Sequence, residues 1–457
     1  MNLKLRLTIL SFLQFFVWGA WLITIATYFF SNNMGTGSEF AAIMSTLALG
    51  SLLMPGITGI IADKWVNAEK LYGVLHILYG AVLFYVPTVK DPDTLFYVIL
   101  VAMIFYMPTI SLSNAISYTI LKRNNYDVVK VFPPIRVWGT IGFIVAMWVT
   151  NLSGSKTNSN QFIIGAVAAI ILGIYAFSIP KCPPQKSIAK DATIIEQLGL
   201  NAFKLFAKYK MALFFIFSLF LGAALQLTNM YGDTFLDDFK KVPEYGPEAF
   251  VVKYSTIIMS ISQISETLFI LAIPFFLKRF GIKKVMLFSM IAWVIRFGLF
   301  SYGNPAEGLW MIVLSCIVYG MAFDFFNISG SLFVESTTDS KIRSSAQGVF
   351  MMMTNGIGAY IGAKVSGWLI DKFYTLKFTD LNGLLAYVKS DVNNPAVKEI
   401  LSFNEVLADG TLKNPAVIKD WQPIWLAFAI YALVVAVLFA VLFRHKHNPN
   451  EVANVQH

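Results

Sequence analysis

The sequence contains little charge and almost no cysteine. Only 13% of its 457 residues are Asp, Glu, Lys or Arg, against about 25% in soluble domains. Its two cysteines, Cys182 and Cys316, are too few for a disulfide framework and are expected to be packing or incidental thiols. The sequence has no metal-ligand spacing and no nucleotide-binding motif, so neither a metal nor a cofactor is expected. These absences argue against a disulfide-rich secreted protein and a soluble cofactor enzyme.

Hydrophobic residues are abundant and make up 57% of the chain. A water-soluble fold of this size could not bury so much apolar surface, so the surrounding solvent is expected to be lipid. The apolar residues form blocks of roughly 17–25 residues, the length of a membrane-spanning helix. About twelve spans are expected by this criterion, at residues 7–31, 41–62, 71–89, 94–121, 134–152, 161–180, 211–231, 249–277, 285–302, 309–334, 345–370 and 421–443.

The positions of lysine and arginine predict the orientation of these spans. If the N-terminus is inside, the inner segments hold most of the basic residues, and the short outer loops hold few. This positive-inside pattern predicts a multi-pass protein with both termini in the cytoplasm. It also explains the net charge of +9 by topology and contact with anionic lipid, so nucleic acid is not expected as a partner.

The spans divide into two sets of six. The longest inner loop, residues 181–210, is expected to be a cytoplasmic connector with an interfacial helix around 194–206. It would join an N-terminal six-helix bundle, residues 1–180, to a C-terminal six-helix bundle with a cytoplasmic tail, residues 211–457. The predicted fold is therefore an all-α membrane protein of twelve helices in two six-helix pseudo-repeats.

Two matched inner turns support the internal repeat. Residues 59–64 (GIIADK) follow the second span, and residues 277–284 (LKRFGIKK) follow the eighth. Together they resemble two degenerate copies of the cytoplasmic loop motif of the major facilitator superfamily. In that superfamily the motif helps to latch the inner ends of the helices.

Ionisable residues inside the spans mark candidate functional positions, because each costs about 2.5–3.5 kcal/mol at a helix centre on the insertion scale. Glu266 and Asp324 lie more than a turn from the ends of their predicted helices. Gln263 lies three residues before Glu266, and Asn327 lies three residues after Asp324, so each pair shares one helix face. The ionisable candidates are Arg136, Glu266, Arg296, Asp324 and Lys364.

Two further helices repeat this spacing. Gln226 and Asn229 are three residues apart on the seventh span. Arg136, Thr140 and Phe143 are four and then three residues apart on the fifth. Four helices thus carry polar stripes that are expected to face a cavity or one another.

Three of the charges leave an alternative open. If the fifth helix starts at Pro133, Arg136 lies near its inner end and could reach the membrane interface instead. Arg296 and Lys364 have no polar companion at helical spacing, so they are interpreted as structural charges or gating pairs.

Six segments of the sequence match a known family closely: residues 2–5 (NLKL), 15–21 (FFVWGAW), 132–143 (FPPIRVWGTIGF), 261–270 (ISQISETLFI), 323–330 (FDFFNISG) and 344–348 (SSAQG). In these segments the sequence resembles the bacterial nucleoside:proton symporters, one family of the major facilitator superfamily. The resemblance runs from the first span to the last, with an extended outer loop at about 373–422 as its main departure.

The resemblance implies import of nucleosides such as uridine and adenosine with protons, by alternating access around a central site. It also implies a bacterial inner membrane, and we expect a monomer that contacts lipid. The family's substrate site falls on Arg136, Thr140, Phe143, Gln226, Asn229, Gln263, Glu266, Phe323 and Asp324.

The residue types suit these roles. The phenylalanines would pack on the base, and the amides can donate and accept hydrogen bonds with base edges and ribose hydroxyls. Arg136 with ionised Glu266 and Asp324 sums to one negative charge, so one acid is expected to bind a proton and leave the cluster neutral. Asp324 is favoured as the carrier, although Glu266 remains an alternative.

Two other functions remain to be distinguished. A proton symporter for sugars or other small polar solutes would need similar acids, an arginine and aromatic residues. A membrane enzyme would need a catalytic or metal cluster near an interface, and the histidines, with His76 alone in a span, do not supply one. The protein is therefore expected not to be an enzyme.

Overall fold

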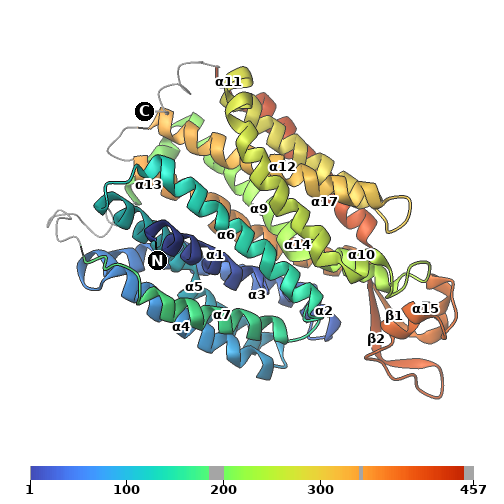
Figure 1. Cartoon of the computed structure of the whole chain (residues 1–457). Helices are drawn as coiled ribbons and strands as arrows, with labels where there is room; N and C mark the ends of the chain where they lie inside the picture. Colours follow the sequence, from blue (N-terminus) through green and yellow to red (C-terminus); the bar gives the residue numbers. More distant parts are fainter. Residues whose placement is uncertain (1, 185–199, 339–342, 447–457) are drawn as a thin grey trace.

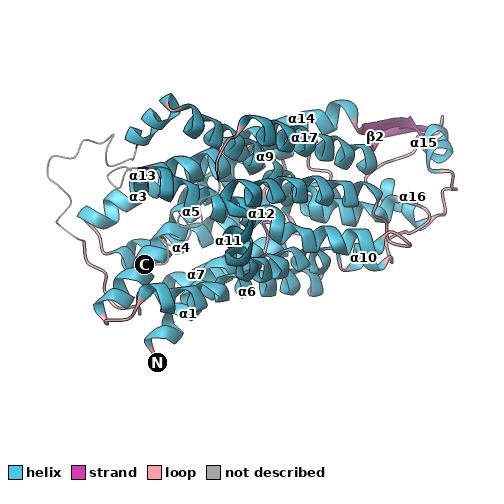
Figure 2. Ribbon diagram, turned by 90° about the horizontal axis from the view of Figure 1, so that it is seen from above, coloured by secondary structure: helices cyan, strands magenta, loops and turns pink. Residues whose placement is uncertain are grey.

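The structure, a computed structural model, describes residues 2–184, 200–338 and 343–446. Long helices run side by side, with both chain termini near one end of the bundle and a small β-sheet at the other (Figure 1). We call these the terminal end and the sheet end. Figure 2 shows the same elongated bundle after a quarter turn, again with the sheet projecting beyond the helices.

The helices of residues 2–184 pack chiefly on one another, with α1 against α6, α3 against α5 and α4 against α7. Gly142 of α6 lies so close to the backbone of Phe12 in α1 that a Cβ atom there would clash. Such small residues allow membrane helices to approach closely. The elements are α1 (Leu3–Gly19), α2 (Ile25–Ser31), α3 (Gly37–Lys64), α4 (Ala68–Tyr85), η1 (Val86–Thr88), α5 (Pro92–Arg123), α6 (Val128–Leu152) and α7 (Asn160–Ala176).

The helices after residue 200 form a second group, in which α12 and α17 pack on α11, and α14 packs on α9. The elements are η2 (Leu200–Ala207), α9 (Tyr209–Asp237), η3 (Asp238–Lys241), α10 (Phe250–Lys253), α11 (Ser255–Tyr302), α12 (Leu309–Thr337), α13 (Arg343–Met351), η4 (Met352–Gly358), α14 (Ala359–Phe373), β1 (Thr375–Asp380), α15 (Leu381–Val388), α16 (Pro395–Ile400), β2 (Thr411–Lys419) and α17 (Trp421–Leu442).

Every span predicted from the sequence falls on helix in the structure. Eight helices of the described residues are long and apolar enough to cross a membrane. One of them, α11, holds two predicted spans, because the chain reverses at Gly281, whose φ of 78° is outside the helical range. Phe276 and Phe288 on either side of this turn lie 6.2 Å apart, so the two arms of α11 are antiparallel neighbours.

Four predicted segments differ in detail. The first predicted span is broken between α1 and α2, and the span at 345–370 contains the π-helix η4 between α13 and α14. The fifth helix starts at Val128, not at Pro133, so Arg136 lies two turns inside α6. Of the predicted interfacial helix at 194–206, the described part forms the 3₁₀ helix η2, and residues 194–199 lie outside the described residues.

The outer loop predicted at 373–422 has its own fold. Strands β1 and β2 pair antiparallel, with Leu376 opposite Ile418. Helices α15 and α16 pack on this sheet around a small core that includes Leu384, Ile400 and Leu412. No secondary structure was predicted here from the sequence, because these helices and strands have only six to nine residues each. We call residues 375–419 the sheet subdomain.

At the sheet end, ion pairs and hydrogen bonds join the two groups of helices. Asp237 of α9 accepts Lys156 Nζ from the first group at 2.8 Å and Lys240 Nζ at 2.9 Å. Asp233 accepts a 2.5 Å hydrogen bond from Thr27 Oγ1 of α2. Lys240 also pairs with Glu399 of the sheet subdomain at 2.9 Å, so the subdomain belongs to the same network.

A second contact at this end involves Asp371 of α14. Its carboxylate accepts the backbone N–H groups of Gly37 at 2.9 Å and Ser38 at 2.6 Å. These are the first residues of α3, where unpaired N–H groups and the helix dipole favour an anion. The contact therefore fixes α14 against α3 from the other group.

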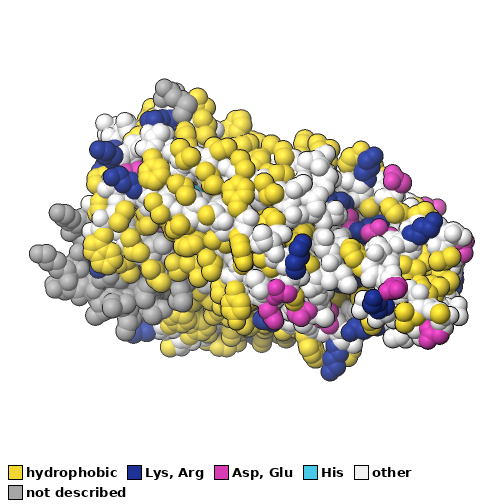
Figure 3. Space-filling model, turned by 90° about the horizontal axis from the view of Figure 1, so that it is seen from below, with side chains coloured by type: hydrophobic (Ala, Val, Ile, Leu, Met, Phe, Trp, Pro, Cys, Tyr) yellow, Lys and Arg dark blue, Asp and Glu magenta, His cyan; other side chains and the backbone are white. Residues whose placement is uncertain are grey.

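The surface also fits a membrane protein. In Figure 3, hydrophobic side chains cover much of the visible face, whereas most Asp and Glu side chains gather toward the sheet end. Exposed large hydrophobic residues occur along most of the long helices, for example Leu271 at 77% exposure and Val441 at 65%. Lipid is the solvent in which such a surface is stable.

Candidate substrate and proton site

Arg136 is held on α6 by an aromatic ring and a glycine. Its guanidinium carbon lies 4.0 Å from the ring centroid of Phe15 in α1, a cation–π contact. A Cβ atom on Gly139 would lie 2.7 Å from Arg136 Nη1, so glycine leaves the space that the guanidinium fills. The Arg136 side chain therefore lies along its own helix, in the space that Gly139 leaves about one turn away.

The two acids come from neighbouring helices. Gly320 of α12 lies against the backbone of Ser265 and Glu266 in α11, where an added Cβ would lie 2.5 Å from Ser265 O. Asp324 lies one turn beyond Gly320 and is 5% exposed. This close packing is why two carboxylates, distant in sequence, lie near each other.

The three charges form one electrostatic chain across the two groups of helices. Arg136 interacts with Glu266, and Glu266 interacts with Asp324. Among the described residues, none of the three forms a direct ion pair within 4.0 Å. The carboxylates are therefore close enough to influence each other and are not neutralised by contact with the guanidinium.

Three of the predicted site residues carry buried polar atoms without a partner. Gln226 Nε2, Gln263 Oε1 and Asp324 Oδ2 are buried and have no hydrogen-bond partner in the structure. Buried polar groups in proteins are nearly always paired, because each unpaired group costs about 1–3 kcal/mol. Three unpaired groups on three helix segments are what a site for a polar ligand requires.

The remaining predicted residues are placed as follows. Phe323 stacks on Tyr319 with a centroid distance of 5.9 Å and an interplanar angle of 7°, and Phe143 packs edge-on against Trp18 at 6.3 Å. Thr140 on α6 and Asn229 on α9 are partly exposed. Their side chains form no hydrogen bond with another described residue, so the structure does not join them to the charges directly.

Tyr319 and Arg296 were not predicted as part of this region. The Arg296 guanidinium is fully buried, donates a 2.6 Å hydrogen bond to Ser315 O, and lies 4.7 Å from the Tyr319 ring centroid. Tyr319 in turn stacks on Phe323 of the predicted site. The hydrogen-bond acceptors of Arg296 come from other helices or from the other arm of α11, so helical spacing in its own span could not reveal them. Lys364, the other unassigned charge, is exposed on α14.

The family model for nucleoside H⁺ symporters matches residues 1–448 of the chain. The chain belongs to the nucleoside:proton symporter family. It is 46% identical to xanthosine permease of Escherichia coli over 99% of this chain and 98% of that protein. It is also 46% identical to the E. coli nucleoside permease NupG, over 98% of this chain and 97% of NupG.

Solved structures agree with this assignment. The crystal structure of the nucleoside transporter NupG superposes with a TM-score of 0.82, covering 98% of this chain and all of that one. A bacterial homologue of the lysosomal transporter Spinster, at 13% identity, has a TM-score of 0.66 and shows the shared fold alone. The resemblance inferred from the sequence is confirmed: the protein is a nucleoside:proton symporter of the major facilitator superfamily, not an enzyme.

Proposed function

We propose that this symporter imports nucleosides such as uridine and adenosine across the bacterial inner membrane as a monomer. The substrate site comprises Arg136, Thr140, Phe143, Gln226, Asn229, Gln263, Glu266, Phe323 and Asp324. Residues 1–180 and 211–457 act as the two six-helix bundles that move about this site, joined by the connector at 181–210. Alternating access exposes the site to each side of the membrane in turn.

The observation that carries the site is the electrostatic chain from Arg136 through Glu266 to Asp324, beside unpaired amide groups. It supports separate roles for the amides and the acids. The amides of Gln226 and Gln263 bind the polar edges of the nucleoside, and the acids bind the proton. Phe143 and Phe323 supply apolar surface for the base, worth about 1–3 kcal/mol by analogy with stacking in nucleic-acid sites.

Coupling follows from the cost of moving charge through the bilayer. With both acids ionised, Arg136, Glu266 and Asp324 carry one net negative charge. A single proton on Asp324 makes the cluster neutral, and the loaded protein can then change state. Because the Oδ2 atom of Asp324 has no protein partner, it is free to hold that proton or to accept a bond from the substrate.

The sheet end is proposed to face outward, with both termini in the cytoplasm. The positive-inside pattern of the sequence supports this orientation. In this orientation the ion pairs at the sheet end close the outer side of the molecule. The structure then represents a state in which the site is sealed from outside.

One experiment tests the proposal as a whole. Purified protein in vesicles, without a membrane potential, is given uridine or adenosine, and the pH outside is recorded. We expect alkalinisation outside that depends on the nucleoside. Competition of labelled uridine by unlabelled nucleosides, but not by sugars, tests the substrate class, and uptake without proton movement would refute the coupling.

A further inference from the structure

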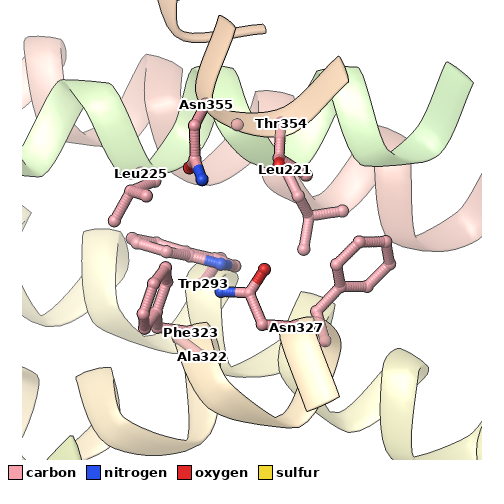
Figure 4. A pocket seen from close by; sticks show the side chains of 10 residues that line it. Leu221, Leu225, Trp293, Ala322, Phe323, Asn327, Thr354 and Asn355 are labelled. Atoms are coloured by element: carbon pink, nitrogen blue, oxygen red, sulfur yellow. The ribbon is translucent and has the colours of Figure 1, made fainter. Parts of the chain in front are cut away.

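A small cavity adjoins the predicted substrate site (Figure 4). It lies between α9, α11, α12 and η4, and is lined by Leu225, Trp293, Phe323, Asn327, Thr354 and Asn355 among others. The centre of a water-sized probe can occupy only about 10 Å³ of the cavity, which is room for about one water molecule. The lining side chains therefore nearly fill the cavity in this state, and Phe323 connects it to the site described above.

Two carboxamides point into this cavity from different helices. In Figure 4 the side chains of Asn327 and Asn355 approach from opposite sides, with the indole of Trp293 and the ring of Phe323 alongside. An amide can both donate and accept hydrogen bonds. Flat aromatic walls and two such amides suit a nucleobase, which has a flat face and an edge carrying donors and acceptors.

Asn355 lies on the π-helix η4 and its side chain has almost no partner within the protein. Its Nδ2 atom has one weak contact, with Met351 Sδ at 3.7 Å, and the residue is exposed. The backbone carbonyl oxygen of Asn355 accepts a hydrogen bond from Ser51 Oγ of α3 at 3.4 Å, so the residue lies where the two groups of helices meet. Short π-helical turns within α-helices are frequent at functional sites.

Asn327 is tied to the acid site by the helix that carries both. It follows Asp324 by three residues on α12 and therefore lies on the same face. Leu225, another lining residue, precedes Gln226 of the predicted site. A nucleoside with its ribose near the acids would thus bring its base to these side chains once they move apart.

We propose that Asn327 and Asn355 bind the polar edge of the nucleobase and set the selectivity among nucleosides. This inference rests on the proposed function. It assigns recognition of the base to residues separate from those that bind the proton, so selectivity and coupling can be altered independently.

The test uses pairs of nucleosides that differ by one amino or carbonyl group on the base edge. Inhibition of labelled uridine uptake is measured with unlabelled uridine and cytidine as one pair of competitors, and with inosine and adenosine as the other. In the Asn355→Ala and Asn327→Ala variants we expect the ratio of inhibition constants within a pair to change by roughly tenfold, as one discriminating hydrogen bond is lost. Proton-driven accumulation of the preferred nucleoside should be retained.

For the Asn355→Asp variant, the direction in which the ratios of inhibition constants change can also be predicted. An ionised carboxylate only accepts hydrogen bonds. The variant should therefore favour cytidine and adenosine, whose amino groups donate, over uridine and inosine. Asn393→Ala, an exposed amide in the sheet subdomain, is the matched control and should leave both ratios unchanged.

The outcomes separate this inference from the proposed function. If the variants transport nucleosides and both ratios of inhibition constants stay as in the parent, Asn327 and Asn355 do not discriminate between bases. The inference is then wrong, while the proposed function stands. If the parent protein is not inhibited by any nucleoside, the proposed function itself fails. Because the Asn355 side chain makes only one weak contact, its replacement should fold, and Asn327→Ala provides the second, independent variant.

Discussion

The acids that join the helix groups at the sheet end are paired, whereas three polar side chains at the centre are not. At the sheet end, Asp237 is paired by two lysines, and Asp371 by two backbone N–H groups. At the centre, Gln226, Gln263 and Asp324 each leave a buried atom unpaired. The paired acids stabilise a contact between the helix groups. The unpaired groups destabilise the fold until a ligand or a proton supplies the missing hydrogen bond.

The largest effect is expected from a change at Asp324, one of the unpaired groups at the centre. We expect Asp324→Asn to abolish accumulation of uridine driven by the membrane potential. That potential supplies about 2.3 kcal/mol per 100 mV, or roughly fifty-fold accumulation, for one proton. Exchange of labelled for unlabelled uridine should continue, because it needs no net proton movement. Uphill uptake and counterflow in vesicles measure both, and unchanged uphill uptake would rule out Asp324 as the carrier and direct attention to Glu266.

A paired acid at the sheet end should behave differently. Asp237→Asn leaves Lys156 and Lys240 buried with weaker partners, and breaking a buried ion pair typically costs about 3–5 kcal/mol. We expect a clear loss of melting temperature with little change in nucleoside affinity. Lys413→Met, which breaks an exposed pair with Glu405 at 62% and 65% exposure, should cost at most about 1 kcal/mol. Equal losses in the two variants would contradict the structural role of the sheet-end network.

Two buried glutamines test the same contrast without charge. Gln263→Leu removes an amide whose oxygen is unpaired in the protein, so we expect a roughly tenfold weaker affinity for uridine and an unchanged melting temperature. Gln14→Leu removes an amide that donates to Thr109 at 2.9 Å and accepts from Tyr72. Its loss should lower the melting temperature first. Thermal shift and saturation uptake distinguish the two, and the reverse pattern would overturn the interpretation of the unpaired atoms.

The smallest effect is expected from pH at the outer end. Lys419 of the sheet subdomain is buried, with its Nζ 3.5 Å from the Phe30 ring centroid. Burial, aided by Lys241 and opposed by Asp238 and Asp371, lowers the pKa of Lys419 to about 8. Opening this end would hydrate the amine and raise its pKa, so opening takes up a proton and becomes less favourable as the outer pH rises above about 8.

We therefore expect counterflow uptake to slow by a few-fold between an outer pH of about 7.5 and 9.5. Lys419→Met should flatten this dependence, since the group that titrates is gone. Counterflow avoids a contribution from the proton gradient itself. A profile that is identical in the two proteins would show that Lys419 does not titrate between these states.

The sequence predicted the membrane helices well and their interactions less well. A bilayer selects long apolar runs, so hydropathy alone placed every span. It could not predict the break between α1 and α2, or the sheet subdomain, because these depend on tertiary contacts between short segments. The central residues were found for two reasons: Glu266 and Asp324 are costly in lipid, and their segments resemble a known family.

The surroundings of Arg296 and Asn355 could not be predicted from the sequence, for related physical reasons. Arg296 is paired with a backbone carbonyl from another helix, a group that every residue possesses and no pattern marks. Asn355 acquires its position from the π-helical turn, which has no clear sequence signal. Polar partners supplied by the backbone, and residues placed by irregular geometry, therefore remain outside what spacing rules can predict.

The π-helix η4 has a consequence for how this chain can vary. A π-turn contains one residue more than an α-turn, and each residue of an α-helix advances the azimuth by about 100°. Without the extra residue, α14 would be rotated about its axis by that amount relative to α13. Asp371 would then turn away from the first residues of α3, and Gly367 from Ala41, against which it now packs. A deletion of one residue within 352–358 should therefore harm this protein more than most substitutions there.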